Sequence, residues 1–104
     1  MAKFHFTDLH GFKDYVVFVK LCAPDEFPAR DGYGPDEQWT LDLAFEGLRE
    51  GLKMAIEEKG DKPVFAKCRE LVGKAYEHYR EGKHNEGYFA LEEVRKLLRK
   101  VPTQ

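Results

Sequence analysis

The sequence predicts an all-α protein, an antiparallel helical bundle of about four helices with one long loop. Apolar residues recur at helical spacing along most of the chain, and Gly, Pro and Asp separate the stretches where helices stop and start. The composition, with 42% hydrophobic and 35% charged residues, is typical of a globular protein. Because a chain of 104 residues has room for one core, we expect residues 1–104 to form a single helical domain.

The first predicted helix lies within residues 4–22, and a buried strand over residues 15–22 is the alternative. Thr7 or Asp8 can cap the start of the helix. Its apolar side chains share one broad side at helical spacing: Leu9, Phe12, Tyr15, Val16, Phe18, Val19 and Cys22. The β-branched and aromatic run at the centre of this segment is also typical of strands, so both alternatives stay open.

A long loop is predicted over residues 23–34, because two prolines and two glycines prevent a regular helix there. Loops of about 12 residues or more in a compact domain commonly carry function. Phe27 and Tyr33 in the loop, and Trp39 just after it, are therefore candidate partner-binding residues. The alternative is that the loop rings fold back over the core.

The second helix is predicted over residues 35–59, since Pro35 suits a first turn and Asp36 and Glu37 suit the positive end of a helix dipole. Its uncharged arc exceeds half of the circumference. The arc combines a stripe of large side chains, Leu41, Phe45, Leu48, Leu52 and Ile56, with a stripe of small residues, Ala44, Gly47, Gly51 and Ala55. A helix with one neighbour needs an apolar arc of only about 100°. We therefore expect this helix to contact two partners, which are helices of the same domain or a second subunit.

The small residues Gly47, Gly51 and Ala55 predict close packing against another element. Each helix-interior glycine costs about 1 kcal/mol relative to alanine, a cost that a close approach explains. The charged residues among them exclude a lipid setting for this spacing. A homodimer through this helix is therefore a candidate. No segment is apolar enough to span a membrane and no secretory signal is present, so we expect a soluble, cytoplasmic protein.

Two further helices are predicted, one from Pro63 to a stop at Gly82 and one starting near Asn85 or Glu86 and ending at residue 101. Asp61 is a candidate cap for the first of them. On the last helix, Phe89 falls on the charged side. It either packs against the preceding loop or stands exposed for a partner, and we include it among the candidate partner-binding residues.

Residues 72–102 resemble a single tetratricopeptide repeat. The matching positions are Val72-Gly73, Tyr76, Gly82 at the turn, Gly87 at a small-residue position, Leu91 and Pro102. The segment departs from the repeat in its longer turn and in Val94, which stands where the repeat has alanine. The resemblance implies a helical hairpin and a peptide-binding or scaffold role, and a generic antiparallel hairpin explains the same residues.

The chain offers little for catalysis, and we expect no cofactor. It contains no serine and no phosphate-binding glycine loop. Cys22 and Cys68 lie in apolar stretches, where burial suppresses thiolate formation and where reduced thiols are expected. His78, Glu81 and His84 include one Glu-x-x-His spacing, so a metal-dependent enzyme is an alternative, although a glycine interrupts the motif.

The formal net charge is -2, which removes the global attraction of a dedicated nucleic-acid binder. Basic residues gather at the end of the last helix, where they stabilise the helix dipole: Arg95, Lys96, Arg99 and Lys100. A nucleic-acid accessory role through them is a further alternative. The leading hypothesis is a small, non-catalytic protein–protein interaction or regulatory module that self-associates.

Overall fold

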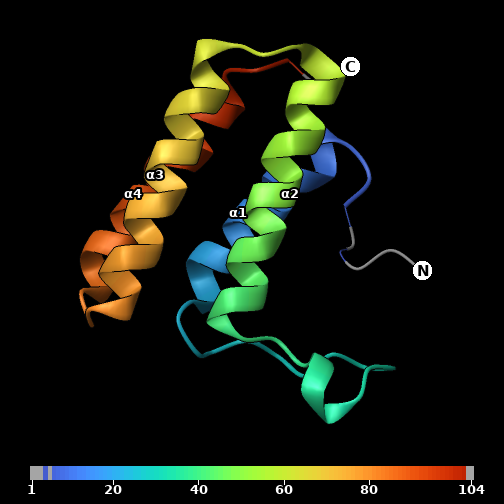
Figure 1. The fold of residues 1–104 in the computed structure, drawn as a ribbon, viewed down its shortest axis with the longest axis vertical. Helices are drawn as coiled ribbons and strands as arrows, with labels where there is room; N and C mark the ends of the chain where they lie inside the picture. Colours follow the sequence, from blue (N-terminus) through green and yellow to red (C-terminus); the bar gives the residue numbers. More distant parts are fainter. Residues whose placement is uncertain (1–3, 5, 103–104) are drawn as a thin grey trace.

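The computed structural model describes residues 4 and 6–102, and this part of the chain is helical without strands (Figure 1). Its elements are α1 (Leu9–Cys22), η1 (Pro35–Glu37, a 3-10 helix), α2 (Leu41–Lys59), α3 (Pro63–Arg80) and α4 (His84–Arg99). The predicted all-α bundle with one long loop is therefore confirmed, and the 15–22 segment is helix rather than strand. None of the helices in these residues has the length and apolar character needed to cross a bilayer.

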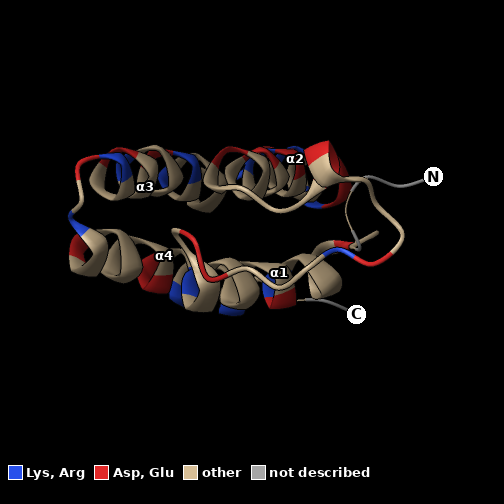
Figure 2. Ribbon diagram, turned by 90° about the horizontal axis from the view of Figure 1, so that it is seen from below, with Lys and Arg blue, Asp and Glu red and all other residues tan. Residues whose placement is uncertain are grey.

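The four α-helices run alternately up and down and form two layers. One layer consists of α2 and α3 and the other of α1 and α4 (Figure 2). Helix α1 packs against α2 and α4, and α3 packs against the same two helices. Residues 23–40, which include η1, lie beyond the end of the bundle where α1 stops and α2 starts (Figure 1).

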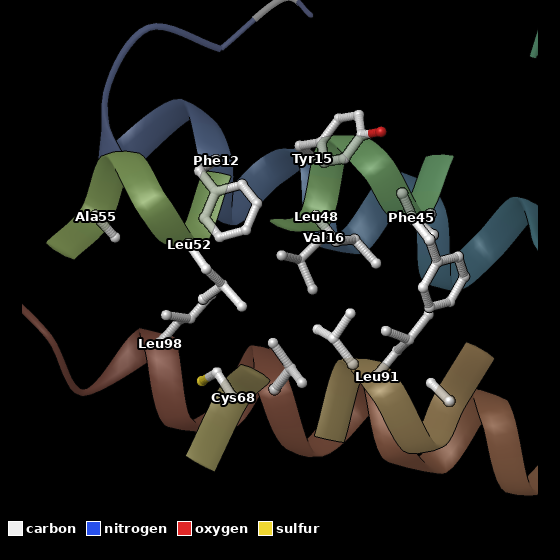
Figure 3. Close-up of a cluster of buried hydrophobic side chains, with 14 of the residues drawn as sticks. Phe12, Tyr15, Val16, Phe45, Leu48, Leu52, Ala55, Cys68, Leu91 and Leu98 are labelled. Atoms are coloured by element: carbon white, nitrogen blue, oxygen red, sulfur yellow. The ribbon is translucent and has the colours of Figure 1, made fainter. Parts of the chain in front are cut away.

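Apolar side chains from all four helices meet between the layers (Figure 3). The largest fully buried ones are Phe12, Phe45, Phe65, Leu9, Leu48, Leu52, Leu91 and Leu98. Burial of each such side chain stabilises the fold by about 1.5–3 kcal/mol. The thiol of Cys68 is buried in the same core, and that of Cys22 is half-buried. Both cysteines are free, as expected for reduced thiols.

The predicted start of the second helix at Pro35 is wrong. Residues Pro35–Glu37 form one isolated 3-10 turn, and α2 begins only at Leu41. Thr40 is the cap, because its backbone is extended and its Oγ1 accepts a hydrogen bond from the Leu43 amide at 3.0 Å. A proline followed by two acids suits a 3-10 turn as well as an α-helix, and Thr40 supplies the stronger start signal.

The remaining helix ends agree with the sequence more closely. Asp8 caps α1 by accepting a hydrogen bond from the Gly11 amide at 2.9 Å. Lys62 occupies the N-cap position of α3 without a side-chain hydrogen bond, so the expected Asp61 cap is wrong. Helix α4 begins at His84, slightly earlier than predicted.

Candidate functional site

Residues 23–40 and the end of α1 enclose a concave pocket with a volume of about 430 Å³. Its lining residues are Phe18, Pro28, Ala29, Arg30, Asp31, Tyr33 and Trp39. The volume lies in the range of pockets that bind small molecules or single anchoring side chains, and most of the lining is apolar, as in such pockets. We call this site the aromatic pocket.

Trp39 is the central wall of the aromatic pocket. Its ring centroid lies 5.2 Å from that of Phe18 and 5.9 Å from that of Phe27, which stacks on it. From the core side, the rings of Phe4 and Tyr15 lie 6.3 and 5.9 Å away. These contacts join the wall of the pocket to α1 and to the core, so the indole is held in place before any ligand arrives.

Arg30 forms a second wall and is buried, with 7% of its surface exposed. Its guanidinium carbon lies 3.8 Å from the Tyr33 ring centroid and 4.7 Å from the Trp39 ring centroid. Its Nη1 donates a hydrogen bond to the carbonyl of Glu37 at 2.9 Å. A desolvated cation–aromatic contact is worth about 2 kcal/mol, so Arg30 fixes the separation of the two rings.

Gln38 holds the loop backbone around Arg30. Its Nε2 donates to the carbonyls of Arg30, Tyr33 and Gly34 at 3.2, 3.1 and 3.3 Å. Its Oε1 accepts from the Arg30 amide at 2.7 Å. The Gln38 side chain therefore satisfies backbone groups that have no helix partner, and it holds residues 30–38 in a compact loop.

Neither Arg30 nor Gln38 was predicted from the sequence as a residue of the site. A glutamine that bonds its own loop has the same sequence signature as one exposed to water. The available signal was a single arginine between aromatic residues in an otherwise acidic segment, a composition that favours cation–aromatic stacking.

The exposed charges around the aromatic pocket are acidic. Residues 23–40 carry five acidic residues and one basic residue, a net charge of -4, and Arg30 is the buried basic one. The exposed acids are Asp25, Glu26, Asp31, Asp36 and Glu37 (Figure 2). Clustered charge of one sign beside a concave surface attracts oppositely charged groups, so the pocket favours cationic neighbours.

The structure brings together three of the four expected partner-binding residues. Tyr33 and Trp39 line the aromatic pocket, and Phe27 stacks behind Trp39. Phe27 and Trp39 also pack on the core. The same two rings therefore cover the core and form part of the pocket. Phe89 lies apart on α4, with 66% of its surface exposed and its ring against Tyr88, rather than packed on the preceding loop.

The small residues of α2 receive aromatic rings from α1. A Cβ at Gly51 would lie 2.0 Å from a Phe12 ring carbon, and one at Gly47 would lie 2.1 Å from the Tyr15 hydroxyl. Ala55 is fully buried. Helices α1 and α3 are thus the two neighbours that the wide apolar arc of α2 required, and both belong to the same chain.

His78, Glu81 and His84 do not converge on a metal position. His78 lies in the last turn of α3, Glu81 follows that helix, and Gly82, with φ of 78°, turns the chain before His84 begins α4. Within residues 4 and 6–102, no three His, Cys, Asp or Glu side chains are grouped as metal ligands would be. The geometry therefore lends no support to the metal-enzyme alternative.

The two thiols are poorly suited to nucleophilic chemistry. Burial raises the pKa of Cys68 to about 11. The pKa of Cys22 is also raised, first by burial and then by the carboxylate of Glu26. Since the thiolate is the reactive form, both cysteines are largely unreactive at neutral pH.

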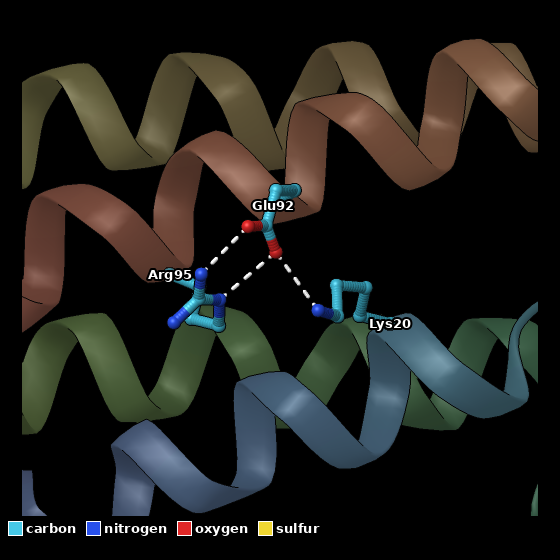
Figure 4. A network of polar contacts seen from close by, with 3 residues as sticks. All are labelled: Lys20, Glu92 and Arg95. Carbon is cyan, nitrogen blue, oxygen red and sulfur yellow. Dashed lines mark hydrogen bonds and ion pairs between the residues drawn. The ribbon is translucent and has the colours of Figure 1, made fainter.

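One of the basic residues on α4 is engaged inside the chain. Arg95 donates two hydrogen bonds to the carboxylate of Glu92, at 2.9 and 2.6 Å, and Lys20 of α1 donates to the same group at 2.8 Å (Figure 4). These hydrogen bonds, with that of Arg95 the largest cause, hold the pKa of Glu92 well below its usual range. The network joins α1 to α4 and leaves Lys96, Arg99 and Lys100 as the exposed cations.

No protein-family model matches this chain, and no curated protein or solved structure matches it with significant similarity. The tetratricopeptide resemblance of residues 72–102 therefore rests on its motif residues. These residues span the second half of α3 and all of α4, an antiparallel hairpin of a kind that helical bundles also contain.

Proposed function

We propose that this chain is a non-catalytic protein–protein interaction module that binds a segment of a partner protein in the aromatic pocket. The observation that carries the proposal is the arrangement of Tyr33, Trp39 and Arg30 around a concave surface of about 430 Å³. Aromatic residues and arginine are the side chains most enriched at the energetic centres of protein interfaces. The Gln38 hydrogen bonds favour binding because they order the loop in advance.

The chemistry of the pocket selects an apolar or aromatic side chain flanked by Lys or Arg. The apolar lining accepts the anchor, and the exposed acids of residues 23–40 attract the basic flanks. An aromatic anchor buries about 150–250 Å², which is roughly 4–6 kcal/mol at 25 cal/mol per Å². Association costs a similar amount, so we expect reversible binding that weakens as salt screens the flanking charges.

A displayed library of random peptides, selected on the immobilised protein, tests this function. We expect enriched peptides with an aromatic or aliphatic residue next to Lys or Arg. Trp39 is the only tryptophan in the chain, so its fluorescence reports binding at the pocket. Tyr33→Ala should weaken binding at least about tenfold. Phe89→Ala, which removes an exposed ring outside the pocket, is the matched control and should leave binding unchanged. Peptides whose binding is insensitive to Tyr33→Ala would contradict the proposal.

Self-association is the second candidate, and exposed apolar side chains at one end of the α1–α4 layer favour it. The exposed large hydrophobic residues in the described part of the chain are Leu21, Tyr88 and Phe89, at 64%, 38% and 66%. They lie on adjacent ends of α1 and α4, where the Lys20 ammonium is 5.3 Å from the Tyr88 ring centroid. Sedimentation equilibrium over a wide concentration range should show a dimer that Phe89→Glu abolishes. A constant monomer mass would rule out this candidate.

We also propose a cytoplasmic location. Free cysteines, one of them buried in the core, are typical of proteins that fold in a reducing compartment. Fluorescence microscopy of the tagged protein in its native cell would check this, and a secreted or envelope signal would contradict it.

A further inference from the structure

We propose that a groove between α2 and α3 binds a small organic anion, a carboxylate carried on an apolar body. The groove has a volume of about 280 Å³ and is lined by Arg49, Leu52, Arg69, Val72 and Gly73. It lies in the α2–α3 layer and shares no residue with the aromatic pocket. The two sites are therefore chemically distinct, one surrounded by acids and the other flanked by arginines.

The floor of the groove is aliphatic and its sides are cationic. Leu52 and Val72 are 1% and 2% exposed, so they close the floor and offer only a little surface of their own to a ligand. Arg49 of α2 and Arg69 of α3 are both exposed. This combination suits a ligand with an apolar body and one negatively charged end.

Neither arginine forms an ion pair with another described residue. Glu70, the neighbour of Arg69 in the sequence, accepts a hydrogen bond from Lys67 at 3.1 Å instead. On the other side, the Asp42 carboxylate accepts a hydrogen bond from the Tyr76 hydroxyl. Glu70 and Asp42 thus bind other partners, and both guanidinium groups can bind an external anion.

Tyr76 lies one helical turn after the lining residue Gly73 on α3, and its ring attracts cations. The guanidinium carbon of Arg49 lies 5.8 Å from the Tyr76 ring centroid, and that of Arg80 lies 5.6 Å away. Arg80 also donates a hydrogen bond to the Tyr76 hydroxyl at 2.7 Å. The contact with the Tyr76 ring therefore helps to hold the guanidinium of Arg49, which lines the groove, in place.

Gly73 keeps the wall of the groove open on the α3 side. At Gly47, Gly51 and Gly87, a Cβ would overlap an aromatic ring of this chain, so packing explains each glycine. At Gly73, which is exposed in the middle of α3, a Cβ would meet nothing within 4 Å beyond the backbone of its own helix. Glycine at such a position weakens a helix, and no group of this chain uses the space it leaves. A ligand lying between Arg49 and Arg69 would use that space.

The size of the groove limits the ligand. A volume of about 280 Å³ lies just below the usual range for drug-sized ligands, so a short or medium-length body fits. A carboxylate matches the planar fork of a guanidinium and can be bound by two parallel hydrogen bonds. Octanoate is therefore a suitable probe, with inorganic phosphate as an anion without an apolar body and octan-1-ol as an apolar body without charge.

Titration of the ¹⁵N-labelled protein with these three compounds, followed by NMR, tests the proposal. We expect octanoate to shift the Gly73 amide and the Arg49 and Arg69 signals saturably, and the two control compounds to bind at least about tenfold more weakly. Equal binding of inorganic phosphate or octan-1-ol would overturn the proposed ligand class, and shifts that do not saturate would overturn the site.

Two variants separate a ligand site from a structural role. Arg69→Gln should weaken octanoate binding about tenfold or more, whereas Arg99→Gln, an exposed arginine on α4, should leave it unchanged. Gly73→Ala should raise the thermal midpoint of unfolding and yet weaken octanoate binding, because the new methyl group takes up part of the groove. A Gly73→Ala protein that binds octanoate as well as the wild type would overturn the proposal.

Discussion

Replacing Gly51 by alanine tests the packing of α1 on α2, which also supports the wall of the aromatic pocket. The new Cβ would lie 2.0 and 2.1 Å from two ring carbons of Phe12, which is fully buried. Carbon atoms pack at about 3.5–4.0 Å, so the ring has to move by about 1.5–2 Å through a filled core. Overpacking of this kind costs about 1–3 kcal/mol, and alanine returns about 1 kcal/mol of helix propensity. Since the overlap is large, we expect a net loss of about 2 kcal/mol.

Gly73→Ala is the matched control, because it makes the same change in a helix interior where a Cβ meets nothing. It should stabilise the fold by about 1 kcal/mol through helix propensity alone. Urea unfolding followed by circular dichroism measures both variants. If Gly51→Ala were as stabilising as Gly73→Ala, the close packing of Phe12 against α2 would be refuted. Adding Phe12→Leu to Gly51→Ala should recover part of the loss, because it removes the overlap.

Three further perturbations probe the loop, the thiols and the ion-pair network. Gln38→Leu removes the hydrogen bonds to three loop carbonyls, so the Trp39 fluorescence should shift to longer wavelength and peptide affinity should fall about tenfold. The helical circular dichroism should stay unchanged. A fluorescence spectrum without this shift would contradict the role of Gln38. At pH 7.5 a disulfide reagent should modify Cys22 slowly and Cys68 only after unfolding, because burial raises the pKa of Cys68 to about 11. If the folded Cys22→Ala protein, in which Cys68 is the remaining thiol, reacted as fast as Cys22 does in the wild type, this expectation would be contradicted. Glu92→Gln should destabilise the fold at pH 7 relative to the control variant Glu93→Gln, because it removes the carboxylate that Arg95 and Lys20 share. Since the folded-state pKa of Glu92 is lowered, this difference in stability should be fully present above the unfolded-state pKa of about 4.3 and should shrink as the pH falls below it. A difference that grows in acid would contradict the network in Figure 4.

The helices were predictable because the apolar residues of their packing faces recur at helical spacing along the sequence. Leu9, Phe12, Val16 and Val19 follow one another at helical spacing, and the structure buries all of them. The run at 15–19 was ambiguous from propensity alone. It is helical because the side chains of Phe12 and Tyr15 have complementary space at Gly51 and Gly47, which no local rule connects to them.

The start of α2 shows where local signals compete. Pro35, Asp36 and Glu37 satisfy the rules for a helix start, but Thr40 supplies a side-chain cap that the earlier position lacks. The Gln38 hydrogen bonds then hold the intervening residues in a loop. The Thr40 cap and the Gln38 hydrogen bonds exist only once the loop has formed, so the periodicity of the sequence could not decide between a helix start at Pro35 and one after Thr40.

The aromatic residues of the candidate site were predictable, whereas Arg30, Gln38 and the geometry of the site were not. Phe27, Tyr33 and Trp39 were found because long loops in compact domains commonly carry function and aromatic side chains offer a large apolar surface. The concavity itself depends on Arg30 stacking against Tyr33 and Trp39, a contact that forms only after the loop folds. The groove at Gly73 was hidden for the same reason, because an unused glycine is recognised only when its neighbours in space are known.

The position of a bound peptide on the protein tests the central claim most directly. With the tightest peptide from the library selection, intermolecular nuclear Overhauser effects to the Trp39 indole locate the anchor side chain. We predict contacts from that side chain to the rings of Trp39, Tyr33 and Phe18, and their loss when Tyr33 is replaced by alanine. A peptide that binds the protein with contacts only to the helical faces, and none to these rings, would contradict the assignment of the aromatic pocket as the binding site.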